Sequence, residues 1–195
     1  MIFPKTELQF INPQMGYGVV ATEFIPKGTI TWVLDRLDRE FTPRQIQQLP
    51  PTYQGIIDTY SYRNNRGNYV LCWDFGRYVN HSFKSNCLTT AYNFEIAIRD
   101  IYPGEQLTDD YGYLNVNTPF EPIDEGTERK VVYPDDLPNY YSQWDAQLKE
   151  VFPLIVRVPQ PLKSLLSQQQ WKTVEKVANQ QQEMRSILTC YFYNK

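Results

Sequence analysis

Two short polar stretches constrain the fold of this chain more than any other sequence feature. The first, RYVNHSFKSNC, runs from Arg77 to Cys87 and contains His81, the single histidine of the chain. The second, GEQLTDDYG, runs from Gly104 to Gly112 and begins in a Pro-Gly turn signal. A strand-like segment, Thr90 to Ile98, lies between them. We therefore treat the two stretches as parts of one functional unit.

A third motif lies upstream, where GYGVVA spans Gly16 to Ala21 and IPKG spans Ile25 to Gly28. Three motifs in a fixed order are far more specific than any one of them. Together they resemble the SET-domain protein lysine methyltransferases, whose C-terminal motifs are close to R-x-x-N-H-S-C-x-P-N-C and G-E-E-L-T-x-D-Y-G. The resemblance implies a mainly β fold with added α. In that family several small sheets form a β-clip with a pseudoknot, and here we expect a C-terminal helical extension after it.

The resemblance also implies S-adenosylmethionine as the cofactor, held by six residues. These are Gly16, Tyr17, Gly18, Asn80, His81 and Tyr111. Glycine lets a main chain approach a ligand closely, which suits the methionine end of the cofactor. Taken alone, the glycine pair also fits a tight turn in any β protein. A lone histidine between Asn and Ser is likewise more often a structural residue than a ligand.

Tyr111 is the residue that we expect to be catalytic. Methyl transfer requires a neutral lysine amine, whereas free lysine has a pKa of about 10.4. A narrow aromatic channel disfavours the ammonium form by desolvation, and the sulfonium adds like-charge repulsion. A tyrosine hydroxyl and carbonyl oxygens then orient the amine and the methyl group. No strong base is needed in this scheme, because positioning can supply up to ~7–11 kcal/mol of the barrier.

Asp109 and Tyr62 are expected to line the channel for the substrate lysine. By the resemblance, the position two before Tyr111 is usually aromatic or aliphatic and influences how many methyl groups are added. A carboxylate there would raise the pKa of the target amine and retain a water molecule, which predicts monomethyl-lysine as the product. The chain has no cysteine-rich flank, so we expect no metal. Tyr113 and Phe120 are candidates to cover the adenine.

The composition of the chain narrows the classes of molecule that we expect it to bind. The net charge of −3 argues against direct nucleic-acid binding and suits a lysine-bearing protein or peptide substrate. The three cysteines are odd in number and widely spaced, which predicts reduced thiols rather than disulfides. No signal peptide and no run of 18 apolar residues is present, so we expect a cytoplasmic protein that does not bind membranes, with a nuclear location left open. The oligomeric state is not indicated.

The chain divides into three regions by composition. We expect residues 1–115 to be the SET-like catalytic domain, residues 116–139 an extended acidic connector, and residues 140–195 a helical C-terminal extension. Four prolines and six carboxylates disfavour a helix in the connector. Asn139 is a suitable N-cap for the first helix of the extension.

Two helices are predicted in more detail. Thr42 can cap a helix that starts at Pro43, Gln45 can complete a capping box, and Pro50-Pro51 ends it. The last helix is predicted to be the longest, and to pack on the β domain or on another subunit. The positions that recur every three or four residues are Trp171, Val174, Val177, Gln181, Met184, Leu188 and Tyr191, and Gln181 is the one polar residue that interrupts the apolar stripe.

Two other functions remain open from the sequence. One is a SET-like peptide-binding or scaffold module without transfer activity, which Asp109 favours. The other is a metal-dependent hydrolase that uses His81, Asp109 and Asp110. The hydrolase fits poorly, because adjacent side chains in a strand point to opposite faces and one histidine with two such carboxylates does not build a three-ligand site.

Overall fold

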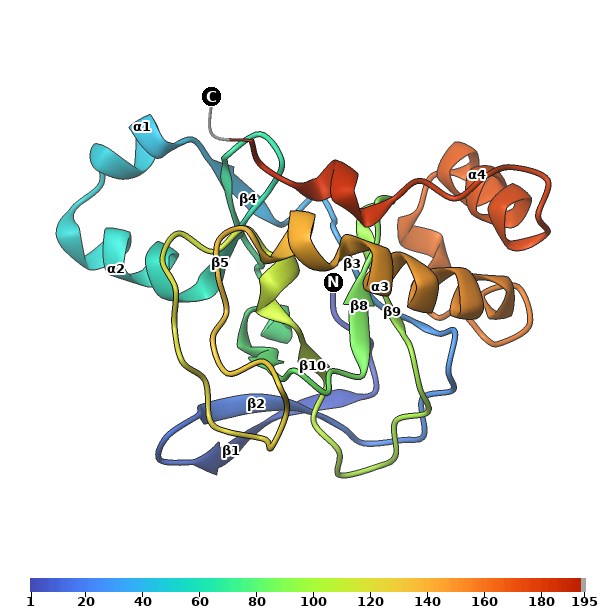
Figure 1. Cartoon of the computed structure of the whole chain (residues 1–195), viewed down its shortest axis with the longest axis horizontal. Helices are drawn as coiled ribbons and strands as arrows, with labels where there is room; N and C mark the ends of the chain where they lie inside the picture. The colour runs from blue at the N-terminus through green and yellow to red at the C-terminus, as the bar shows by residue number, and fades with distance from the viewer. Residues whose placement is uncertain (194–195) are drawn as a thin grey trace.

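Short strands with helices on two sides of them make up the structure, a computed structural model that describes residues 1–193 (Figure 1). Within these residues the strands form two two-stranded and two three-stranded sheets. All pairings are antiparallel except β7 with β10. The strands are β1 Thr6–Asn12, β2 Gly16–Ala21, β3 Ile30–Val33, β4 Arg39–Phe41, β5 Ser61–Arg63, β6 Tyr69–Leu71, β7 Asn80–His81, β8 Cys87–Thr89, β9 Phe94–Ala97 and β10 Thr108–Asp109. The expected mainly β architecture with added helices is confirmed.

The sheet β3–β9–β8 has two different faces. Phe94 and Ile96 of β9 are buried in a core that they share with the C-terminal helices. Glu95 lies between them and therefore points to the opposite face, because successive side chains in a strand alternate. On that face it stands beside Trp32, its partner in the register of β3 and β9. This second face borders the candidate site.

The helices follow in chain order, with five 3-10 turns among them. They are α1 Pro43–Gln47, α2 Pro51–Tyr60, η1 Phe75–Tyr78, η2 Tyr111–Tyr113, α3 Asp136–Val151, η3 Phe152–Leu154, η4 Lys163–Leu165, α4 Gln168–Ala178 and η5 Ile187–Cys190. The predicted start of α1 is confirmed: the Gln45 N–H donates to the Thr42 hydroxyl at 3.2 Å, and the Thr42 N–H donates to the Gln45 side chain at 2.8 Å. The second proline of the Pro50-Pro51 pair, which ends α1, also begins α2.

The predicted start of α3 is wrong. The helix begins at Asp136, with Asp135 as its N-cap, so Asn139 lies inside the helix instead of capping it. Pro138 does not prevent this earlier start, because a proline in the first turn removes an N–H that has no partner within the helix. With 16 residues α3 is longer than α4, which has 11.

The predicted long terminal helix is also wrong beyond Ala178. The N–H of Gln181 donates to the carbonyl of Lys176 at 2.8 Å and that of Gln180 to Val177 at 3.0 Å. Gln180 has a φ of 59°. This is a Schellman ending, which glycine usually makes, and its formation by glutamine left no signal in the sequence.

The residues after this ending return to the same core in a different conformation. Ile187 is fully buried, and its N–H donates to the Asp145 carboxylate at 2.8 Å. Leu188, which the helical spacing placed on the buried stripe, is less buried than Ile187. Met184 still packs against the core as expected. Tertiary contacts therefore override the helical spacing here.

One apolar core joins the helices to the β-sheet. Leu148 and Val151 of α3 and Val174 of α4 are essentially without solvent exposure and pack with Phe94 of β9. Figure 1 shows α3 running across the sheet, with α4 beyond it. The expectation that the C-terminal region packs on the β domain is confirmed.

A long segment, residues 116–135, connects η2 to α3 without a strand or a helix. Phe120 and Val132 form an isolated antiparallel bridge, with mutual backbone hydrogen bonds of 3.1 and 3.0 Å, so the segment doubles back on itself. Among residues 1–193, no helix has both the length and the apolar character needed to cross a membrane.

Candidate functional site

The parallel pairing of β7 and β10 brings the two polar motifs together. Asn80 lies opposite Thr108, and His81 lies opposite Asp109. The Ser82 N–H extends this ladder by donating to the Asp109 carbonyl at 2.9 Å. Residues that are about 30 positions apart in the chain therefore share one site.

Tyr111 follows directly from this ladder. Its N–H donates to His81 Nδ1 at 3.0 Å, and its hydroxyl donates to the Val79 carbonyl at 2.6 Å. Burial raises the pKa of Tyr111, and the charges of Asp109 and Glu95 add to the rise. The hydroxyl is thus protonated at neutral pH, and its oxygen lone pairs remain available to accept a hydrogen bond.

His81 is neutral. Burial lowers its pKa to about 4, and the nearby Arg129 contributes. Because Nδ1 accepts from Tyr111, the proton must lie on Nε2, which is buried without a partner among the described residues. The ring centroid of Phe83 lies 4.5 Å from that of the His81 imidazole, and the ring centroid of Phe120 lies 5.6 Å from it. His81 therefore offers an unused N–H donor inside an aromatic enclosure.

The β1–β2 hairpin packs against the first motif through Asn80. The Asn80 amide donates to the Tyr17 carbonyl at 3.1 Å and to the Gln106 side chain at 3.0 Å. A Cβ on Gly18 would lie 2.4 Å from the Gln106 side-chain oxygen and 2.8 Å from the Asn80 side-chain nitrogen. The close approach that Gly18 permits is thus to these two side chains. Gly16 starts β2 with a φ of 75°.

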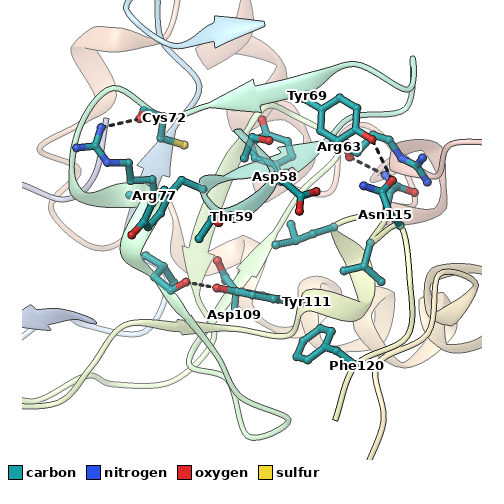
Figure 2. A pocket seen from close by; sticks show the side chains of 18 of the residues that line it. Asp58, Thr59, Arg63, Tyr69, Cys72, Arg77, Asp109, Tyr111, Asn115 and Phe120 are labelled. Carbon is teal, nitrogen blue, oxygen red and sulfur yellow. Dashed lines mark hydrogen bonds between the residues drawn. The ribbon is translucent and has the colours of Figure 1, made fainter. Parts of the chain in front are cut away.

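A cavity of about 280 Å³ opens beside Tyr111. The end of α2, β5 and residues 114–120 contribute to its lining, and Asn115 lies against β5, where its amide donates to the Arg63 carbonyl at 2.9 Å. Figure 2 shows Asp58 and Tyr69 across the cavity from Tyr111. Trp32 and Tyr62 also line it, with their rings 6.0 Å apart and nearly perpendicular. Aromatic rings therefore form part of the cavity lining, alongside the charged side chains of Asp58, Arg63 and Arg77.

Two acidic side chains complete the inner wall. Glu95 and Asp109 both line the cavity, and their carboxyl groups hydrogen-bond to each other. Burial raises the pKa of Asp109 to about 6, against hydrogen bonds from Tyr113 and Glu95 that lower it. Burial also raises the pKa of Glu95, and the charge of Asp109 raises it further. The pair consequently holds a proton more firmly than ordinary surface carboxyls do.

Segment 116–135 is fastened to the first motif through Glu125. Its carboxylate accepts hydrogen bonds from the Ser82 hydroxyl at 2.7 Å and the Phe83 N–H at 2.9 Å. The Lys84 ammonium donates to the Glu125 carbonyl at 2.6 Å. These bonds hold the segment over β7, where Phe120 reaches both His81 and Tyr111.

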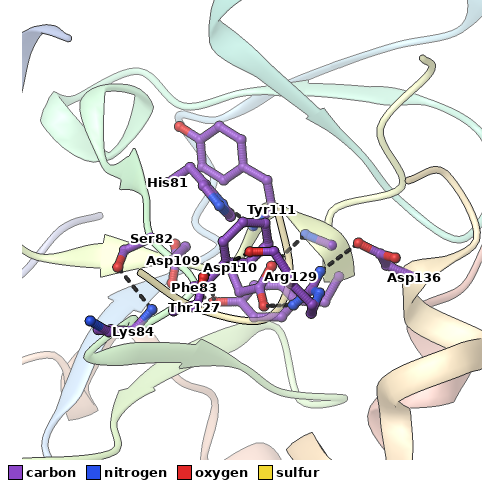
Figure 3. Close-up of polar contacts among 12 residues, drawn as sticks. His81, Ser82, Phe83, Lys84, Asp109, Asp110, Tyr111, Thr127, Arg129 and Asp136 are labelled. Carbon is purple, nitrogen blue, oxygen red and sulfur yellow. Dashed lines mark hydrogen bonds and ion pairs between the residues drawn. The ribbon is translucent and has the colours of Figure 1, made fainter. Parts of the chain in front are cut away.

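Arg129 fastens the same segment to the second motif. Figure 3 shows its guanidinium between Asp110 and Asp136, and it forms ion pairs with both carboxylates. The guanidinium carbon also lies 4.5 Å from the ring centroids of Phe83 and Tyr140. A Cβ at position 112 would come within 2.6 Å of the guanidinium, so the Gly112 of the motif leaves room for it.

The predicted site residues fall into two neighbouring groups. Tyr111, Asp109 and Tyr62 line the cavity together. The other predicted residues cluster around β7 and the start of β2, outside the cavity lining. They are Gly16, Tyr17, Gly18, Asn80 and His81. Tyr111 contacts both groups, because it lines the cavity and bonds His81.

One candidate for covering the adenine is wrong and one stays a prediction. Tyr113 has 1% of its surface exposed, and its hydroxyl donates to Asp109 at 2.8 Å, so it is not available to a ligand. Phe120 lies over His81 and Tyr111 and remains a candidate. Sequence reasoning missed Glu95 and Arg129. Glu95 could have been noticed as an acidic residue within the otherwise apolar run FEIA. No feature of the sequence pointed to Arg129.

The sequence matches a protein-family profile described as the SET domain, over residues 16–112. It matches no curated protein. Among solved structures, a chain of the assembly described as apo ctPRC2 with two substitutions in Ezh2 is similar, with a TM-score of 0.44 and 22% sequence identity. That similarity covers 56% of this chain and 15% of the length of the other.

Proposed function

Since this chain is a SET-domain protein, matched over residues 16–112, we propose that it transfers the methyl group of S-adenosylmethionine to the side-chain amine of lysine in a protein substrate. The observation that carries the proposal is the position of Tyr111. Its hydroxyl oxygen is fixed by the Val79 carbonyl at 2.6 Å, and its side chain lines an aromatic cavity. A positioned tyrosine at the end of such a cavity suits an in-line transfer to an amine.

The residues around β7 fit such a cofactor. His81 has a buried Nε2 donor without a partner among the described residues, which an acceptor on a bound ligand would satisfy. The main chain of Gly16–Gly18 lies beside Asn80, and Phe120 supplies an aromatic surface at His81. When bound there, the cofactor would supply an activated methyl group. Tyr111 would separate it from the cavity.

The residues of this chain would act mainly by positioning. The Tyr111 hydroxyl donates to Val79, so its lone pairs can accept a hydrogen bond from an amine N–H. The aromatic lining, with Trp32 and Tyr62, disfavours the charged form of a lysine by desolvation. The Glu125 and Arg129 contacts hold residues 116–135 in place, so that Phe120 limits the access of water.

Asp109 bears on the number of methyl groups added. It lines the cavity and is 4% exposed, so little space remains beside it. A water retained beside Asp109 would occupy the space that a second methyl group needs, and we propose monomethyl-lysine as the product. Mass spectrometry of a methylated substrate decides this. Abundant trimethyl-lysine from the wild type would contradict it, as would an unchanged product from Asp109→Phe.

The function is tested in two steps. Calorimetry measures binding of S-adenosylmethionine and of its demethylated product, and we expect binding below millimolar concentration. The protein is then incubated with methyl-labelled cofactor and a lysate, and labelled lysine is identified in the acceptor protein. Absence of cofactor binding would refute the proposal.

The alternative is a SET-like peptide-binding module without transfer activity. The Glu95–Asp109 carboxyl pair in the cavity wall favours it, because a negative charge beside the amine would hold the amine in its unreactive charged form. Cofactor binding without transfer of label, together with binding of a lysine peptide, would favour this alternative. The hydrolase is not favoured, because Asp109 bonds Tyr113 whereas Asp110 bonds Arg129.

A further inference from the structure

The carboxyl pair of Glu95 and Asp109 has a chemistry that positioning by Tyr111 does not use. The two groups come from different strands, β9 and β10, and hydrogen-bond to each other in the cavity wall. A hydrogen bond between two carboxyl groups requires a proton on one of them, because an ionised carboxylate only accepts. Once one carboxyl is ionised, the pair carries one proton and one negative charge.

Residues in and beside η2 hold the Glu95–Asp109 pair in place without neutralising its negative charge. The Tyr113 hydroxyl donates to Asp109 at 2.8 Å and itself accepts from the Asp110 N–H at 3.0 Å. Asp110 is a further carboxylate whose charge acts on Asp109, and its ion pair is with Arg129. The Arg129 charge is therefore already matched by Asp110 and Asp136.

The groups that act on the pair from the other sides are neutral or do not contact it, and Arg63 and Arg77, which also line the cavity, form no ion pair with it. Burial raises the pKa of the Cys87 thiol on β8 and of the Tyr62 hydroxyl on β5, so both are uncharged at neutral pH. The amino group of Met1 acts on Glu95 without contact and forms its own ion pair with Asp35. Within residues 1–193, no ion pair joins a cation to Glu95 or Asp109.

A second polar group in the same wall indicates that the cavity takes up polar molecules. Trp32 is 5% exposed, and its indole Nε1 has no partner among the described residues. A Cβ on Gly76 would lie 3.0 Å from this nitrogen, and both residues line the cavity. A buried donor of this kind needs an acceptor, which a water or a ligand in the cavity supplies.

We propose that the Glu95–Asp109 pair accepts a proton from the ammonium group of the substrate lysine. This step rests on the methyl transfer proposed above. One N–H bond of the ammonium breaks, an O–H bond forms on the ionised carboxylate, and the nitrogen keeps the electron pair. The result is a neutral amine and a pair with two protons. After the transfer the nitrogen is cationic again, and the pair gives its extra proton to water.

The cavity favours this proton transfer through its effect on the carboxyl group that accepts the proton and on the amine that loses it. Desolvation raises the pKa of a carboxyl group and lowers that of an amine, so that the two values approach each other. Efficient proton transfer needs such a match near the working pH. Asp109 reaches a pKa of about 6 here, whereas a free aspartate at about 3.9 would be a much weaker acceptor. This rise comes from burial, since the hydrogen bond from Glu95 lowers the pKa of Asp109.

The first test needs neither cofactor nor turnover. Carboxyl ¹³C shifts of the labelled full chain are followed against pH, with Glu95→Gln and Asp109→Asn used to assign the pair. We expect two linked titration steps, one of them near pH 6. Glu95→Gln should remove the Glu95 step, Asp109→Asn should remove the Asp109 step, and the remaining step should shift in each variant. We also expect n-butylamine to move these two signals, and n-butanol of similar size to leave them unchanged. Two independent titrations near pH 4, or no response to butylamine, would overturn the proposal.

The second test uses the pH profile of methyl transfer. Asp109→Asn should lower the rate at pH 7 by roughly 10²-fold, the low end of general-base effects, because it removes the carboxylate that accepts the proton. The rate should recover near pH 10, where the amine loses its proton to solvent. A loss of equal size at every pH would indicate a structural role and refute the proposal, as would an unchanged profile. Glu150→Gln, an exposed side chain, is the control. If the wild type transfers no methyl group at any pH, the proposed function is refuted. The ¹³C titration then still shows whether Glu95 and Asp109 share a proton and respond to an amine.

Discussion

Replacing Glu95 with glutamine tests the Glu95–Asp109 pair through the stability of the fold. Glutamine has nearly the same size, and its amide can donate to Asp109 as a protonated Glu95 does. The variant therefore keeps the hydrogen bond but cannot gain or lose a proton at position 95. Any change in how stability depends on pH then reports on the pair itself.

The sign and size of the expected change in stability follow from the raised pKa values of Glu95 and Asp109. Because both carboxyls have a higher pKa in the folded chain than in the unfolded one, the folded state binds more protons, and stability falls as pH rises through this window. For Asp109 the rise from 3.8 to about 6 corresponds to about 3 kcal/mol of stability lost between roughly pH 4 and pH 7. The raised pKa of Glu95 extends the loss to higher pH in the wild type.

Urea denaturation of both proteins, followed by circular dichroism from pH 4.5 to pH 8, measures the difference. We expect Glu95→Gln to have a flatter profile and to be more stable than the wild type at pH 8 by about 1–3 kcal/mol, part of the linkage described above. At pH 4.5 the two should be nearly equal. Glu150→Gln should follow the wild-type profile. Parallel profiles for Glu95→Gln and the wild type would show that the pair does not share a proton.

Three further outcomes are expected. Tyr111→Phe should reduce methyl transfer strongly while cofactor affinity and thermal stability stay nearly unchanged, since it deletes one hydroxyl; transfer at the wild-type rate would contradict its role. Arg129→Met should destabilise the fold by about 3–5 kcal/mol in urea denaturation, because it leaves buried carboxylates unpaired, whereas Lys130→Met, which removes an exposed pair, should cost less than about 1 kcal/mol. Deleting residues 168–195 should cause aggregation or a large loss of thermal stability, and a soluble truncation of equal stability would show that α4 is an independent appendage.

The parts of the site that could be predicted from the sequence are those that depend on residues close together in the chain. Asn80, His81 and Tyr111 belong to motifs whose spacing fits the parallel ladder of β7 and β10, and the structure brings them together. The capping box of Thr42 and Gln45 is equally local and was also found. The functional roles of these site residues remain predictions.

The parts that sequence reasoning missed depend on contacts between distant segments. α4 ends at Ala178 because Gln180 takes a backbone conformation usual for glycine, and nothing in the spacing of apolar residues reveals that. Glu95 becomes significant only when β9 is placed against Trp32 and Asp109. Arg129 lies in a segment that looked like an acidic connector, and its importance comes from Asp110 and Asp136 on either side of it.

The core shared by the sheet β3–β9–β8 and the helices α3 and α4 limits how this protein can be recombined. A chimera that exchanged residues 16–112 as a cassette would have to reproduce the back of that sheet, where Leu88, Phe94 and Ile96 have no solvent exposure. A graft from a protein with a different C-terminal region would leave those side chains against a mismatched surface. Viable crossovers should therefore carry the sheet and residues 136–187 from one parent, and hybrid libraries built at the motif boundaries should consist mainly of insoluble members.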